Sequence, residues 1–70
     1  MNEAALIKKE AFEAFIATVD AAIRNDVETE AWQNAFSVET HGDYADDEER
    51  WSVALATARM VADAPADYGL

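Results

Sequence analysis

The chain has 70 residues, with fifteen acidic against five basic side chains, a formal net charge of -10 and no cysteine. A domain of this length buries only about 60% of the surface that its unfolded chain exposes, so we expect it to gain stability by self-association. The missing thiols exclude disulfides, thiolate zinc sites and cysteine nucleophiles, the negative charge argues against direct binding to nucleic acid or anionic membranes, and no apolar stretch approaches the roughly 20 residues of a membrane span.

The first predicted element is a helix over residues 3–24, a stretch without Gly or Pro that is rich in Ala, Leu, Lys and Glu. Its core face has the i, i+3, i+4, i+7 spacing of an amphipathic helix. That face consists of Ala5, Phe12, Phe15, Ile16, Val19, Ala22 and Ile23. A second face consists of Ile7, Ala11, Ala14 and Ala21. A helix that is apolar on two sides is expected to be buried on both.

A bend is expected at Asn25-Asp26, because Asn25 and Glu28 have the spacing of a loose capping box. A short helix over residues 27–36 would follow, and the alternative is one continuous helix without a bend. The residues that the short helix would present are Ala31, Trp32, Ala35 and Phe36. Residues 37–43 have no periodicity and end near the only glycine in the middle of the chain, which predicts a loop.

The last predicted helix covers residues 44–64 and ends before Pro65, which cannot continue an α-helix. Asp43 or Asp46 is expected to cap it, and the acidic residues that follow lie where the helix dipole favours negative charge. The core face comprises Tyr44, Trp51, Ala54, Leu55, Ala58 and Ala62, and the opposite face comprises Val53, Ala56, Met60 and Ala64. The tail, residues 65–70, is expected to be irregular.

These elements predict an all-α fold in one domain, residues 1–70: a helical hairpin of two long helices with a short helix between them. Each long helix has a second apolar face that so short a chain cannot cover by itself. We therefore expect one of these faces to meet another molecule and the chain to form a homodimer.

The most conspicuous cluster in the sequence is acidic. It comprises Asp43, Asp46, Asp47, Glu48 and Glu49, with Glu39 before it. A calcium loop needs oxygen ligands at alternate positions, a central Gly and a later bidentate Glu, and that order is absent because Gly42 precedes the acids. Two compatible interpretations stay open: a solvated helix start that the dipole favours, and a contact patch for a basic partner.

Catalytic, metal and cofactor sites are not indicated by the sequence. General acid catalysis by a carboxyl group needs that group to be desolvated, whereas acids at an exposed helix start stay ionised. His41 is the only histidine, lies between Glu39 and Asp43, and is interpreted as a surface loop residue. With one His, no Cys and no Gly-rich phosphate loop, no catalytic set or cofactor site can be assembled.

Acidic residues on one side of the first helix invite a comparison with a DNA backbone. They are Glu3, Glu10, Glu13 and Asp20. These residues span about 26 Å at 1.5 Å per residue, or one charge per roughly 6 Å, whereas duplex DNA presents one charge per about 1.7 Å. One helix is too sparse, so DNA mimicry would require two helices, the acidic cluster and a second subunit together.

In size, acidity and helical pattern, the whole chain resembles the small early proteins with which bacteriophages disable host machinery, such as anti-CRISPR and anti-quorum-sensing proteins. The resemblance rests on no motif and assigns no residue a role. It implies stoichiometric inhibition, in which the protein occupies a surface that its target needs for DNA or for a second subunit. It also implies that the protein acts in the cytoplasm of a host cell.

The function that these features predict is non-catalytic: inhibition or modulation of a larger protein, such as a DNA-binding regulator or a nuclease, in the cytoplasm. An acidic surface steers the encounter with a basic one, and an apolar helix face supplies affinity. The steering residues are expected to be Asp46, Asp47, Glu48 and Glu49, and the contact residues Trp32, Val53 and Met60. The alternative is a structural subunit whose second apolar faces only complete an oligomer.

Overall fold

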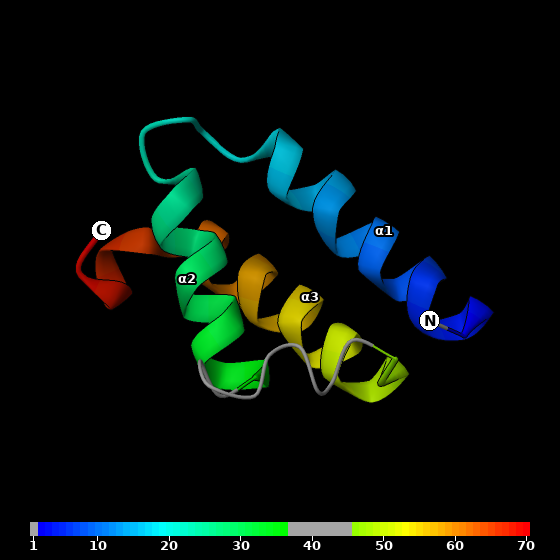
Figure 1. Cartoon of the computed structure of the whole chain (residues 1–70). Coiled ribbons are helices and arrows are strands. Elements are labelled where there is room, and N and C mark those ends of the chain that lie inside the picture. The colour runs from blue at the N-terminus through cyan, green and yellow to red at the C-terminus, as the bar shows by residue number, and fades with distance from the viewer. Residues whose placement is uncertain (1, 37–45) are drawn as a thin grey trace.

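The computed structural model describes residues 2–36 and 46–70. These residues form three α-helices, α1 (Glu3–Thr18), α2 (Arg24–Ala35) and α3 (Glu48–Asp63), followed by a short 3-10 helix, η2 (Pro65–Tyr68) (Figure 1). The described ranges contain no β-strand. The all-helical class predicted from the sequence is therefore confirmed for this part of the chain.

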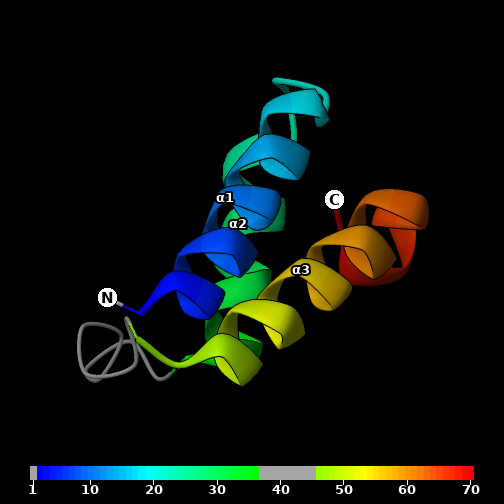
Figure 2. The ribbon, with the colours of Figure 1, turned by 90° about the vertical axis from the view of Figure 1, so that its right-hand side faces the viewer.

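Helix α3 is the central element of the fold. It packs extensively against both α1 and α2, whereas α1 and α2 contact each other little. Figure 1 shows α1 and α2 joined by a turn and diverging from it, and in the turned view of Figure 2 α3 lies to one side of both. Because α1 and α2 diverge, most of the apolar surface that each of them buries is covered by α3.

The start of α1 is tied to the segment before α3 by one side chain. Asn2 is the N-cap residue of α1, and its Oδ1 accepts a hydrogen bond from the Ala5 N–H at 2.7 Å. Its Nδ2 donates to the Asp46 carbonyl oxygen at 2.7 Å. The cap therefore satisfies a free amide of the first helical turn and also joins two segments that lie far apart in the sequence.

The first helix is shorter than the sequence pattern suggested. It ends at Thr18 and not at Arg24, and its C-cap residue, Val19, is extended with φ −73° and ψ 145°. Thr18 and Val19 are β-branched, which lowers helix propensity. The Asp20 side chain then accepts a hydrogen bond from the Ala22 N–H at 2.9 Å, and such local bonds compete with the helix. Three adjacent residues of weak helix propensity therefore end the helix, although the average helix propensity of residues 3–24 is favourable.

The chain does bend between the first two helices, but at residues 19–23. Asn25 and Asp26, where the bend was expected, lie in the first turn of α2, and the N-cap of that helix makes no side-chain hydrogen bond. One continuous helix is also not what the structure shows. The Nη2 group of Arg24 donates to the Val19 carbonyl at 2.9 Å, and a cation at the carboxyl end of α1 suits the helix dipole.

Both ends of α3 differ in detail from their predicted positions. Asp47 caps the helix, its Oδ1 accepting from the Arg50 N–H at 3.2 Å, whereas Asp46 does not cap it. Pro65 ends the helix as expected, but the tail is a regular 3-10 turn rather than irregular. Gly69 closes that turn at φ 77°, a left-handed conformation that glycine adopts without strain. The loop predicted at 37–43 and the residues Glu39, His41, Asp43 and Tyr44 lie outside the described residues.

The core is a single cluster around an aromatic trio. Trp51 of α3 lies between Phe12 of α1 and Phe36 after α2, with ring centroids 5.7 Å and 4.9 Å apart. The buried residues are Ala5, Phe12, Ile16, Val19, Val27, Ala31, Ala35, Phe36, Trp51, Ala54, Ala58 and Val61. The predicted core members Phe15, Ile23, Leu55 and Ala62 are only partly buried, and Ala22 is exposed because it lies in the turn. Val27 and Val61 are fully buried, but the sequence pattern did not predict them as core residues.

Candidate functional site

The exposed face of α3 carries a line of apolar side chains. Val53, Ala56 and Met60 follow one another at i, i+3 and i+7 on the side opposite the buried stripe of this helix. Val53 and Met60 keep 36% and 61% of their surface in solvent. The sequence predicted this second apolar face, and the structure shows that no described element of the same chain covers it.

Glu49 lies at one end of the same face. It precedes Val53 by one helical turn, and both residues line a surface depression together with Asn34, Asp47 and Arg50. From Glu49 to Met60 the rise of the helix spans about 16 Å. Glu49, Val53 and Met60, all predicted contact or steering residues, are therefore brought together on one surface that is acidic at one end and apolar along its length.

The other predicted steering residues have different surroundings. Asp47 is the N-cap of α3, and its Oδ2 lies 3.7 Å from Arg50 Nε in an ion pair, so its carboxylate supports the fold. Asp46 is exposed, and its backbone carbonyl accepts the hydrogen bond from Asn2. Glu48 is exposed in the first turn of the helix. The residues of the cluster are neighbours in sequence, but they do not have one common role.

Trp32 lies apart from the α3 face. Two residues further along α2, the Asn34 Nδ2 donates to the Thr57 Oγ1 of α3 at 2.8 Å, which identifies the flank of α2 that adjoins α3. Residues two positions apart on a helix point about 200° away from each other. Trp32, 37% exposed, is therefore on the other flank. The structure does not bring Trp32 together with Val53 and Met60.

The three arginines have roles that the sequence reading did not identify. Arg24 donates to a carbonyl at the end of α1, and the Arg50 Nη1 donates to the Ala35 carbonyl at the end of α2 at 3.0 Å. Arg59 instead lies over the Phe15 ring, with its guanidinium carbon 5.9 Å from the ring centroid. The general preference for cations at helix carboxyl ends could have suggested Arg24 and Arg50 only if the helix ends had been placed correctly.

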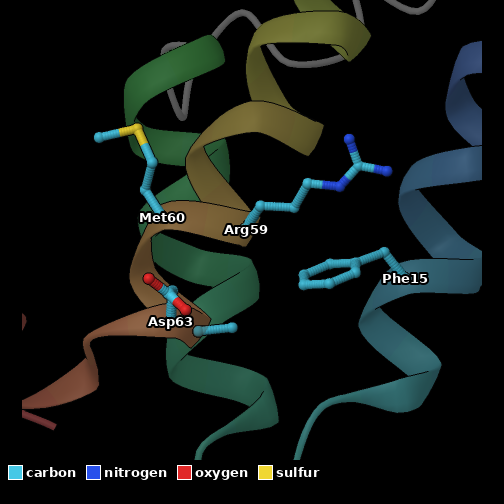
Figure 3. A pocket seen from close by; sticks show the side chains of 5 residues that line it. Phe15, Arg59, Met60 and Asp63 are labelled. Atoms are coloured by element: carbon cyan, nitrogen blue, oxygen red, sulfur yellow. The ribbon is translucent and has the colours of Figure 1, made fainter.

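A shallow open groove between α1 and α3 contains the Arg59 side chain. Its lining residues are Phe15, Arg59, Met60, Ala62 and Asp63. Figure 3 shows Arg59 extending from α3 toward Phe15 of α1, while Met60 projects in another direction. The groove is thus bordered by an aromatic ring, a cation and a flexible thioether, which are side chains that suit contact with a protein surface.

The exposed face of α1 has a different composition. Its second predicted apolar set is in solvent: Ile7, Ala11 and Ala14 on the helix and Ala21 in the following turn are all exposed. The acidic set compared with a DNA backbone, Glu3, Glu10, Glu13 and Asp20, is exposed as well. α1 therefore adds negative charge to the surface, and its exposed apolar residues are several alanines together with Leu6 and Ile7, which do not form a line flanked by the acidic turn of α3.

The described part of the chain contains neither a membrane-spanning helix nor a cluster of metal ligands. No described helix is both long and apolar enough to cross a membrane. Within residues 2–36 and 46–70, no three His, Cys, Asp or Glu side chains are grouped so that they could hold a metal ion.

Comparison with known proteins gives no relative: no family model matches the chain, and no curated protein or solved structure is significantly similar to it.

Proposed function

We propose that this protein is a non-catalytic binding module that inhibits or modulates a larger protein, such as a DNA-binding regulator or a nuclease. The observation that carries the proposal is the exposed face of α3, where Glu49, Val53, Ala56 and Met60 combine an acidic end with an apolar line. The stoichiometric mode of action suggested by the resemblance to phage inhibitors of host machinery fits this surface. The site of action we propose is the cytoplasm.

Affinity in this proposal comes from the apolar side chains. Fully burying a Val or Met side chain contributes roughly 1.5–3 kcal/mol, and Val53 and Met60 are still about one-third and three-fifths exposed. They therefore retain part of that free energy for binding. An interface core of this kind is typically surrounded by a polar rim, and the acidic turn at the start of α3 would form one side of that rim.

Steering comes from the uncompensated negative charge. The chain has a net charge of -10, and two of its arginines donate hydrogen bonds to helix carbonyls. Glu48 and Glu49 are exposed beside the apolar line and would accelerate encounter with a basic surface in a salt-dependent way. We assign Asp47 to the fold and keep Asp46 in the steering group. We leave Trp32 out of this surface because it lies on another flank.

A second candidate function is that of an assembly subunit. Here the α3 face would complete an oligomer of identical chains and would have no host target. The fold of this subunit would be the predicted hairpin. That prediction is supported by the helix lengths, which are 16 residues for α1 and α3 and 12 for α2. The homodimer expected from the sequence is part of the first proposal, whereas this candidate has no target other than its own copies.

Affinity capture with matched variants tests the proposal. The double substitution Val53→Ser, Met60→Ser removes apolar area from the α3 face without a change of charge. Leu6→Ser, Ile7→Ser is the control, because those residues of α1 are similarly exposed at 42% and 58%. The tagged chain and both variants would be incubated with a bacterial lysate and washed at low and then at high salt.

We expect the unaltered chain and the α1 control to retain the same partner, which high salt releases, and the α3 variant to lose it. Equal retention by the two variants would place the binding surface elsewhere. Recovery of the chain alone, with no second protein in any sample, would reject the inhibitor proposal and favour the assembly subunit.

A further inference from the structure

The exposed face of α3 carries opposite charges at its two ends. Glu49 is in the first turn, and Arg59 lies ten residues later near the other end of the helix. Between them on the same side are two small residues, Ser52, which is partly buried, and Ala56, which is exposed. At about 100° per residue, all of these positions fall within one sector of roughly 80° on the helix surface, so they form one continuous seam.

Two copies of this seam complement each other when the helices run in opposite directions, because acidic positions then face basic ones and small residues face small residues. An antiparallel second α3 that places Ala56 opposite Ser52 also places Glu49 opposite Arg59, because both pairs are centred on Ala54. Each contact then occurs twice, as the two-fold symmetry of a homodimer requires. We propose that a second copy of this chain docks antiparallel on α3 in this register, with two Glu49–Arg59 ion pairs flanking a close contact of small side chains.

Arg59 is presented for such a contact. Its guanidinium carbon lies 5.9 Å from the centroid of the Phe15 ring, and this cation–π contact does not use the N–H donors of the group. Arg24 and Arg50, by contrast, donate hydrogen bonds to helix carbonyls. Within the described residues the Arg59 side chain makes no hydrogen bond or ion pair. A planar guanidinium with free donors matches a carboxylate from a neighbouring chain.

A second copy fits both ends of the seam better than a purely basic partner does. A basic surface would complement Glu49 but would oppose Arg59 at the other end, whereas the antiparallel copy satisfies both. Val53 and Met60 lie along one edge of the seam and would be partly covered on docking. The small residues at the centre allow the two helix backbones to approach closely, and close approach increases the area that is buried.

Net charge sets the strength and the salt dependence of this dimer. Two chains of -10 each repel one another over long distances, and added salt screens that repulsion. The dimer is therefore expected to strengthen as salt rises, whereas binding to a basic target would weaken. The inference deepens the second candidate of the proposed function, because it names the helix face, the antiparallel register and the ion pairs of a contact between identical chains. If both hold, a second copy and the target compete for α3.

Sedimentation equilibrium of single and paired charge reversals tests the register. Glu49→Arg and Arg59→Glu each replace two ion pairs with two like-charge contacts, and each is expected to raise the dimer dissociation constant by roughly tenfold or more. The double variant E49R/R59E restores opposite charges and should return the constant to near its original value. Glu10→Arg on α1 is the control, since it makes the same change of charge outside the seam.

Several results would overturn the proposal. They are a monomeric wild-type chain at all accessible concentrations, equal effects of E49R and E10R, or no recovery in the double variant. Circular dichroism of each variant shows whether it is folded, and E49R keeps the test informative even if loss of the Phe15 contact unfolds R59E. A dimer that strengthens from about 20 to 300 mM salt fits the inference, independently of whether any host protein is captured.

Discussion

The two apolar faces of α3 have similar compositions and different surroundings. On one side Trp51, Ala58 and Val61 are buried against α1 and α2, and on the other Val53 and Met60 remain in solvent. The periodicity of a helix identifies both faces, but only the packing of the chain decides which one becomes core. The exposed apolar face is not covered by the described fold, so it does not contribute to the stability of the folded chain.

The difference separates residues that hold the domain together from residues available for binding. Substitutions in the buried face should lower the free energy of unfolding, and those in the exposed face should leave it nearly unchanged while they alter association. A domain of this size has an unfolding free energy of roughly 3.5–10 kcal/mol, so changes of a few kcal/mol decide whether it folds. Stability measurements on matched pairs of variants therefore test which residues of α3 are packed and which remain in solvent.

The largest expected effect is that of Trp51→Ala. Trp51 is 3% exposed and touches the rings of both Phe12 and Phe36, so truncation leaves a cavity where the three helical segments meet. Loss of an aromatic side chain from a core costs about 3–5 kcal/mol. We expect the variant to lose a large part of its unfolding free energy, as judged by circular dichroism and urea denaturation. A loss below about 1 kcal/mol would contradict the packing described for this residue.

Alanines on the two faces give a smaller and more direct comparison. Ala54 is fully buried, and Ala56, two residues later, is exposed. Ala54→Leu forces extra methylenes into a closed space and is expected to cost about 1–3 kcal/mol. Ala56→Leu makes the same chemical change in solvent and should alter stability by less than about 0.5 kcal/mol. Urea denaturation of both variants checks the assignment, and equal losses would mean that the Ala56 side is also packed in solution.

The sequence was sufficient for the helical class and for the main core positions. Phe12, Ile16, Trp51 and Ala58 were expected in the core and are buried, because their spacing follows the helical repeat. Val27 and Val61 were missed although Val61 is one heptad after Ala54. The predicted stripe of α3 was placed about one residue too far around the helix, and it therefore included Leu55 and Ala62, which are only partly buried.

Helix ends and shared surfaces were harder to predict. The end of α1 depends on Thr18, Val19 and Asp20, whose local preferences outweigh an otherwise favourable composition. The separation of Trp32 from Val53 depends on which flank of α2 adjoins α3, and a single hydrogen bond between Asn34 and Thr57 reveals it. Such relations between helices leave no periodic signal within either helix, so sequence spacing could not have indicated them.

The acidic turn of α3 provides the smallest of these effects and divides structural from binding carboxylates. Asp47→Ala removes the cap hydrogen bond to the Arg50 amide and the ion pair with its side chain, so we expect a loss of about 1 kcal/mol. Glu49→Ala removes the same charge from an exposed position two residues away and should cost less than about 0.5 kcal/mol. Urea denaturation distinguishes the two variants, and a larger loss for E49A would contradict the separation of roles. The binding assays should rank the variants in the opposite order, because Glu49 lies on the exposed face of α3, whereas Asp47 acts mainly through the helix that it caps.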